Sequence, residues 1–140
     1  PAAGGFSFDL LVGLSRGGIT VADLLSRVYG GNTPIVSLWV DRHSIYPSSN
    51  FDAPFDWVNE PVVRVIKSGR VRNILLVDDV TRSGRTLIGA RQYLETATAG
   101  DVMFKTAVLL APRSVAHQFE FVAHVRPTDA LGMPFALVED

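Results

Sequence analysis

The sequence predicts an α/β fold in which helices flank a doubly wound, mainly parallel sheet, and three patterns support this prediction. Apolar runs of strand length recur along the chain, at residues 8–14, 34–40, 62–66, 74–77, 102–110, 120–125 and 135–138. Apolar residues at helical spacing follow two of these runs, at residues 19–28 and 87–94. The run at residues 74–77 contains no polar residue, which is typical of a strand buried on both faces of a parallel sheet.

The most informative segment begins with this last run and reads Ile74-Leu75-Leu76-Val77-Asp78-Asp79-Val80-Thr81-Arg82-Ser83-Gly84-Arg85-Thr86. It predicts a strand, then a loop that holds both acids, then a helix from about Gly84 to Thr98. The first amides of a helix lack intrahelical partners and lie at the positive end of its dipole, so this loop can bind an anion. The two carboxylates suit the vicinal hydroxyls of a ribose and can stabilise positive charge in a transition state.

Residues 76–86 resemble the phosphoribosyl-pyrophosphate (PRPP) signature of type I phosphoribosyltransferases, and the resemblance covers most of the chain. It extends to the xanthine-guanine and hypoxanthine enzymes and to the pyrimidine regulator with uracil phosphoribosyltransferase activity. The resemblance implies that the 5-phosphate is bound by Arg82, Ser83, Gly84, Arg85 and Thr86. It implies that Asp78 and Asp79 bind the ribose and are catalytic, and that Mg²⁺ is held through PRPP and by these acids. The alternative is that the two acids merely cap a turn. This would be the better explanation for an isolated acid pair, but here eleven residues match the signature in register.

A second candidate loop, Ser15-Arg16-Gly17-Gly18, follows the first apolar run. Its glycines let backbone amides approach an anion, and the arginine can bind phosphate oxygens through two N–H groups. Taken alone, the tetrapeptide fits a glycine turn with a solvated arginine equally well. Its place after the first core strand is similar to the pyrophosphate loop of the family. That resemblance implies that Ser15, Arg16, Gly17 and Gly18 bind pyrophosphate and that Arg16 is catalytic.

Residues 41–60 combine Pro, Ser, Asn and Asp with aromatic residues, so we expect a long irregular loop. The family resemblance implies a flexible flap here that closes over PRPP, through Ser44, Tyr46, Ser48 or Ser49. An aromatic-anchored surface loop is the alternative. We expect the following basic residues to decorate a solvated edge without a chemical role: Arg64, Lys67, Arg70 and Arg72.

Two departures from the family pattern leave the acceptor base open. The 6-oxopurine enzymes place an aspartate three residues after the second acid, where this chain has Arg82; the orotate enzymes and the pyrimidine regulator also lack it. Residues 121–136 can be laid without gaps on the tail of the xanthine-guanine enzymes, but the base-stacking aromatic falls on Ala130. The resemblance implies a small C-terminal hood in which Ala130, Leu131 and Phe135 bind the base, with a purine slightly favoured. A PRPP- or nucleotide-sensing regulatory domain without turnover is the rival from another class.

Length and composition fit one domain over residues 1–140. Family members usually carry a helix before the first strand, so the resemblance leads us to expect that this domain is excised from a longer chain. Residues 1–5 are expected to be flexible. A net charge of -1 argues against a nucleic-acid partner, and the absence of cysteine excludes disulfides and thiolate metal sites. No apolar run reaches the ~18 residues of a membrane span, and no signal peptide is visible, so we expect no membrane partner and a cytoplasmic location. The resemblance implies a homo-oligomer.

Overall fold

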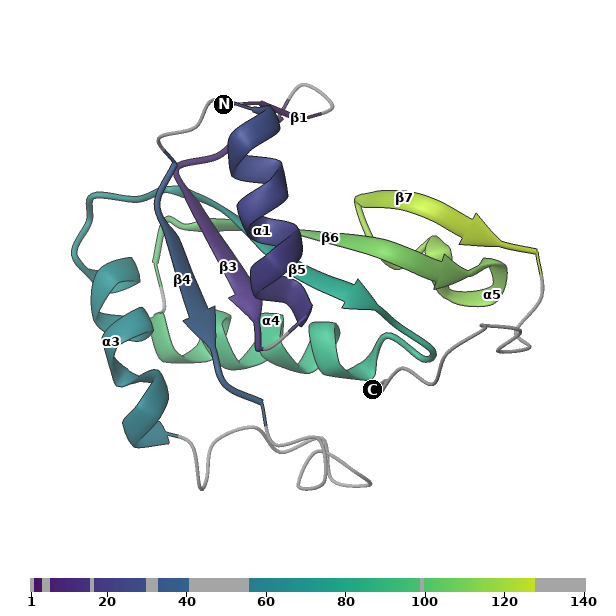
Figure 1. Ribbon diagram of the computed structural model, residues 1–140. Coiled ribbons are helices and arrows are strands. Elements are labelled where there is room, and N and C mark those ends of the chain that lie inside the picture. Colours follow the sequence, from purple (N-terminus) through teal and green to yellow (C-terminus); the bar gives the residue numbers. More distant parts are fainter. Residues whose placement is uncertain are drawn as a thin grey trace.

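The computed structural model describes residues 2–3, 6–15, 17–29, 33–40, 56–98 and 100–127 (Figure 1). Its main sheet has five parallel strands in the order β4-β3-β5-β6-β7. They are β3 (Leu10–Leu14), β4 (Ile35–Leu38), β5 (Asn73–Val80), β6 (Met103–Pro112) and β7 (Phe121–Arg126). The helices are α1 (Gly17–Val28), α3 (Asp56–Lys67), α4 (Arg85–Thr98) and the short α5 (Arg113–Ala116). A separate antiparallel pair consists of β1 (Ala2–Ala3) and β2 (Phe6–Ser7). The predicted α/β sheet is confirmed.

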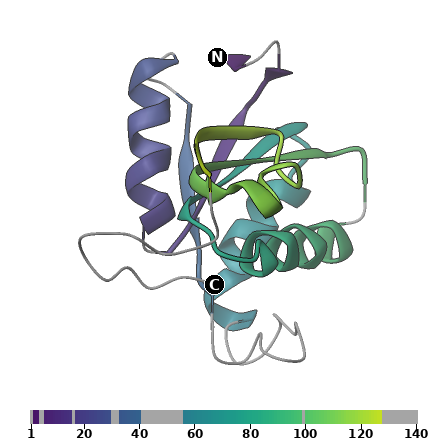
Figure 2. The ribbon, with the colours of Figure 1, turned by 90° about the vertical axis from the view of Figure 1, so that its right-hand side faces the viewer.

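Helices cover both faces of the sheet, with α1 on one side and α3 and α4 on the other (Figure 2). Ile74 and Leu76 of β5 pack into the core cluster beneath α3 and α4, whereas Leu75 and Val77 pack into the cluster beneath α1. Each fully buried leucine contributes roughly 1.5 to 3 kcal/mol to folding. A strand covered on both faces favours an apolar residue at every position, which explains why this run shows no alternation.

The order of the strands reverses beside β3. The chain runs from β3 through α1 to β4 on one side, and then through α3 to β5 on the other side of β3. The helices that follow these neighbouring strands, α1 after β3 and α4 after β5, cover opposite faces of the sheet. Ligands of open parallel sheets bind at such a reversal, outside the carboxyl ends of the strands. The topology therefore brings the two predicted loops to one place.

The main correction to the sequence prediction concerns residues 62–66, which belong to α3 and not to a strand. Val62 and Ile66 are four residues apart, and both are buried in the core cluster on this face of the sheet. Glu60 and Arg64 form an exposed ion pair at the same spacing. A run rich in β-branched residues favours a strand, but here the burial of one helical face outweighs that preference. Residues 56–60, which we expected in a loop, also belong to this helix.

Smaller differences lie at the ends of the elements. The helix after the acids runs from Arg85 to Thr98, within one residue of the prediction. Ala2 and Ala3, expected to be flexible, pair with β2, and α5 was not predicted. The basic residues expected on a solvated edge are exposed, namely Arg64, Lys67, Arg70 and Arg72. The strand predicted at residues 135–138 lies outside the described residues. Within the described ranges, no helix combines the length and hydropathy that crossing a bilayer requires.

Candidate functional site

The first predicted loop meets the two predicted acids at the first turn of α1. A Cβ atom added at Gly17 would overlap the carboxylate of Asp79, at the end of β5. One added at Gly18 would overlap the carbonyl oxygen of Val77 and lie 3.2 Å from the Cα of Asp78. Only glycine lets the backbone of α1 approach β5 this closely. The predicted pyrophosphate loop and the predicted ribose-binding acids are therefore neighbours.

The end of β3 is fitted to the same turn. A Cβ atom at Gly13 would lie 2.8 Å from both the carbonyl oxygen of Gly18 and the Cα of Ile19. Ser15 is buried, and its N–H donates to the carbonyl oxygen of Leu38 at 2.9 Å. The start of the loop is thus tied to β4. Arg16 lies outside the described residues.

The two acids lie inside β5 rather than in the loop after it, which corrects the sequence prediction. The strand continues to Val80, and Asp78 pairs in register with Val108 of β6. Because side chains alternate along a strand, Asp79 lies on the α1 face with Val77, and Asp78 lies on the opposite face. Asp78 is fully buried, whereas Asp79 is partly exposed. Asp79 is therefore the acid that faces the glycines of the first loop.

Each carboxylate also holds the backbone that follows it. Oδ1 of Asp78 accepts from the N–H of Asp79 at 2.9 Å, and Oδ1 of Asp79 accepts from the N–H of Val80 at 2.7 Å. These hydrogen bonds engage one oxygen of each carboxylate and restrict its rotation. The second oxygen of Asp79 is the one next to Gly17. A carboxylate oxygen can accept a hydrogen bond from a ligand hydroxyl or coordinate a cation.

The phosphate loop is fixed by its own hydroxyls. The N–H of Gly84 donates to Oγ1 of Thr81 at 2.8 Å, and the N–H of Arg85 donates to Oγ of Ser83 at 3.2 Å. Gly84 has φ +84°, a left-handed conformation that glycine adopts without strain, and its carbonyl accepts the first bond of α4 from Ile88. Two amides predicted to hold phosphate therefore already bind loop hydroxyls, and a phosphate would have to replace these partners.

The side chains of this loop differ in access to solvent. Those of Arg82 and Arg85 are exposed, and that of Ser83 is partly exposed. Thr86 is fully buried, although the family resemblance assigns it to phosphate binding. The exposed guanidinium groups and the dipole of the fourteen-residue α4 both favour an anion at this end of the helix. Exposed arginines beside a helix N-terminus are the groups that the predicted phosphate site requires.

The sequence did not predict one segment that neighbours the phosphate loop, residues 118–119. A Cβ atom at Gly84 would lie 2.6 Å from Oε1 of Gln118 and 3.0 Å from Cζ of Phe119. These residues belong to the connection between α5 and β7, and Phe119 is buried. No motif pointed to them, because their contact with Gly84 depends on how β6 and β7 are placed. They form one wall of the turn before α4.

The acids suit Mg²⁺ only as part of a site that the ligand completes. Among the described residues, no group of three or more His, Cys, Asp or Glu side chains could hold a metal. Magnesium commonly binds through one or two carboxylates together with substrate phosphates and water. The partly exposed carboxylate of Asp79 fits that role, whereas Asp78 has no exposed surface. A PRPP-bound Mg²⁺ would reach the protein through Asp79.

Several predicted residues lie outside the part of the chain that the structure describes. The base-binding residues Ala130, Leu131 and Phe135 lie outside the described residues, as do the flap residues Ser44, Tyr46, Ser48 and Ser49.

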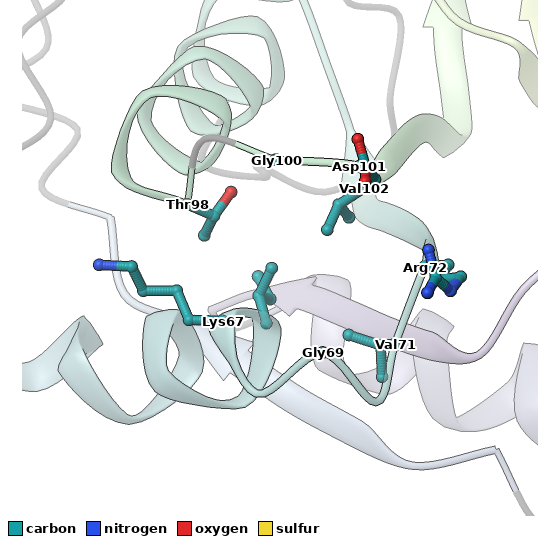
Figure 3. Close-up of a pocket in the computed structure, with 9 residues that line it drawn as sticks. Lys67, Gly69, Val71, Arg72, Thr98, Gly100, Asp101 and Val102 are labelled. Carbon is teal, nitrogen blue, oxygen red and sulfur yellow. The ribbon is translucent and has the colours of Figure 1, made fainter.

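A cavity of about 300 Å³ lies away from the candidate site, before the amino ends of β5 and β6 (Figure 3). Lys67 and Arg72 lie on opposite sides of it. It contains none of the predicted site residues.

Comparison with known proteins agrees with this fold. The family model described as "Phosphoribosyl transferase domain" matches residues 3–120. None of the curated proteins matches the sequence. The chain is similar to the purine phosphoribosyltransferase of Pyrococcus horikoshii, at 17% identity and a TM-score of 0.58, with 95% of this chain and 82% of that chain covered. It is also similar to the xanthine-guanine-hypoxanthine phosphoribosyltransferase of Helicobacter pylori, at 18% identity and a TM-score of 0.58, with 85% and 73% covered.

The structural likenesses, at these identities, concern the fold. The family model covers most of the chain and includes both loops and both acids. The family predicted from the sequence is therefore confirmed. The chain belongs to the phosphoribosyl transferase domain family.

Proposed function

We propose that this domain transfers the 5-phosphoribosyl group of PRPP to a ring nitrogen of a nucleobase and releases pyrophosphate. The observation that carries the proposal is the meeting of Gly17 with the carboxylate of Asp79 at the strand-order reversal. In this proposal, the two loops bind anions on either side of this acid. PRPP has the matching order of groups, with a phosphate and a pyrophosphate at the two ends of a ribose.

In the proposed reaction, the bond from C1 of the ribose to pyrophosphate breaks, a bond to the base nitrogen forms, and the proton of that nitrogen is released to solvent. The loop with Arg82 and Arg85 holds the 5-phosphate, and the loop from Ser15 to Gly18, with Arg16, holds the leaving pyrophosphate. Asp79 accepts hydrogen bonds from the ribose hydroxyls and stabilises the positive charge that develops on the sugar. The carboxylate of Asp78 accepts a hydrogen bond from the N–H of Asp79 and so fixes the backbone orientation at Asp79. Mg²⁺, when bound with PRPP, neutralises the charge on the departing pyrophosphate.

A purine is our first choice of acceptor, because the tail can be laid on that of the xanthine-guanine enzymes. Nucleotide salvage in the cytoplasm by a homo-oligomer completes the proposal. Arg82 favours a second candidate, a PRPP or nucleotide sensor. A guanidinium cannot take a proton from the base, and the 6-oxopurine enzymes have an aspartate at this position.

A screen of bases with PRPP and Mg²⁺, read out as released pyrophosphate, tests the proposal. We expect turnover with at least one of hypoxanthine, guanine, xanthine, adenine, uracil and orotate. Stabilisation of the protein by PRPP without turnover on any base would favour the sensor. If PRPP neither binds nor reacts, both functions are wrong.

Arg82→Ala is expected to raise the dissociation constant of PRPP about tenfold to a hundredfold, as for a hydrogen bond to a charged group of about 1.5 to 3 kcal/mol. Turnover should fall mainly through binding, since an arginine cannot act as a base here. Isothermal titration and steady-state kinetics would measure both effects. Arg70→Ala is the matched control, because Arg70 is also exposed but precedes the amino end of β5. A loss of turnover with unchanged PRPP affinity would instead assign Arg82 to the acceptor.

A further inference from the structure

Asn59, in α3, holds the end of β4 through its side-chain amide. Its Oδ1 accepts from the N–H of Trp39 at 2.8 Å, and its Nδ2 donates to the carbonyl oxygen of Trp39 at 2.9 Å. Asn59 is only 1% exposed. Among the described strands, β4 is at the edge of the sheet and pairs only with β3. The amide therefore takes the place of a neighbouring strand at the residue that follows β4.

Asparagine suits this position for its hydrogen bonds and not for its helix propensity. It is a weak helix former in a helix interior, and a buried amide is unfavourable unless its polar atoms are paired. An amide offers a donor and an acceptor side by side, which match the N–H and C=O of one backbone residue. Aspartate lacks the donor, and leucine lacks both groups. The residue type thus indicates that the two bonds to Trp39 are its role.

The contact continues from β4 to the first loop of the site. Trp39 follows Leu38, whose carbonyl oxygen accepts from the N–H of Ser15 at 2.9 Å. Ser15 begins the loop in which Gly17 packs against the carboxylate of Asp79. Four bonded or consecutive residues therefore connect the interior of α3 with the start of this loop: Asn59, Trp39, Leu38 and Ser15.

We propose that Asn59 is a positioning residue for the pyrophosphate loop, acting through Trp39, Leu38 and the backbone of Ser15. The inference rests on the proposed function, because it takes residues 15–18 as the pyrophosphate site. The phosphate loop after β5 has no part in this connection. Loss of the Asn59 amide should therefore weaken the binding of pyrophosphate and leave the 5-phosphate end of the site unchanged.

The test is Asn59→Leu, which keeps the approximate volume of the side chain and removes both hydrogen bonds. Isothermal titration with pyrophosphate and Mg²⁺ should give a dissociation constant roughly threefold to tenfold higher than in the wild type, as expected for one weakened hydrogen-bonded anchor. The dissociation constant of ribose 5-phosphate should not change. Exchange of the Ser15 N–H, followed by mass spectrometry, should become faster.

Val62→Ala is the matched control, since Val62 is in the same helix and buried on the same side, without a bond to Trp39. It should destabilise the fold but leave both dissociation constants unchanged. If Asn59→Leu does not fold, Asn59→Ser, with one remaining hydroxyl, replaces it. An unchanged affinity for pyrophosphate, or an equal loss for both ligands, would overturn the positioning role. A wild type that binds neither ligand would instead contradict the proposed function.

Discussion

Gly18→Ala is expected to weaken PRPP binding by about a hundredfold or more and to lower the free energy of unfolding by about 1 to 3 kcal/mol. The added methyl group would overlap the carbonyl oxygen of Val77, an atom of the backbone of β5. A side chain could rotate away, but this carbonyl lies in a central strand and cannot. The start of α1 would have to move away from β5. The distance between the predicted pyrophosphate loop and the predicted phosphate loop would then increase. A displacement of about 1 Å is enough to weaken the binding of PRPP, because both of its ends must be held at once.

Gly100→Ala is the control for the general effect of replacing a glycine. A Cβ atom at Gly100 would meet only the carbonyl oxygen of Thr98, at an ordinary 3.7 Å. Denaturant unfolding and isothermal titration with PRPP and Mg²⁺ would measure both effects in both variants. If Gly18→Ala bound PRPP as tightly as Gly100→Ala, the close approach of α1 to β5 would not be needed for the site.

Asp79→Asn is expected to lower kcat/KM about a hundredfold to a thousandfold, since it removes the charge that faces the sugar in the proposed transition state. The fold should persist, because Asp79 is partly exposed and asparagine can still accept from the N–H of Val80. Asp78→Asn should reduce kcat/KM less than Asp79→Asn, because Asp78 is fully buried on the other face of β5. Circular dichroism, PRPP titration and kinetics on both variants would measure these differences.

The decisive result is which of the two variants, Asp79→Asn or Asp78→Asn, loses more kcat/KM. An equal loss in both variants would mean that the two carboxylates reach the ribose together, as the sequence resemblance alone implies. A larger loss in Asp78→Asn would place the functional acid on the α3 and α4 face. Either result would contradict the assignment of Asp79 as the acid between the loops.

The sequence predicted the centre of the fold because local and long-range requirements agree there. Residues 74–77 are apolar since β5 is covered on both faces, and Gly17 and Gly18 are required where α1 touches β5. The helix after the acids was predicted within one residue because its apolar spacing is regular. The joining of two loops into one site followed from the rule for open parallel sheets.

The errors arose where tertiary contacts override local preference. Residues 62–66 have the composition of a strand, but their burial against the sheet makes them helical. The acids were expected in a loop because they are polar, yet Asp78 pairs with Val108 inside the sheet. The contact of Gln118 with Gly84 and the bonds of Asn59 to Trp39 depend on the packing of distant segments, which no local pattern contains.

The central claim is that the loops after β3 and β5 form one site for the two ends of PRPP. Titration of PRPP with Mg²⁺ into the wild type, alone and with saturating pyrophosphate or ribose 5-phosphate, tests it most directly. We expect one PRPP bound per chain, and a lower apparent affinity in the presence of either competitor. Binding of PRPP that neither competitor reduces would contradict the claim, because the loops would then not share one ligand.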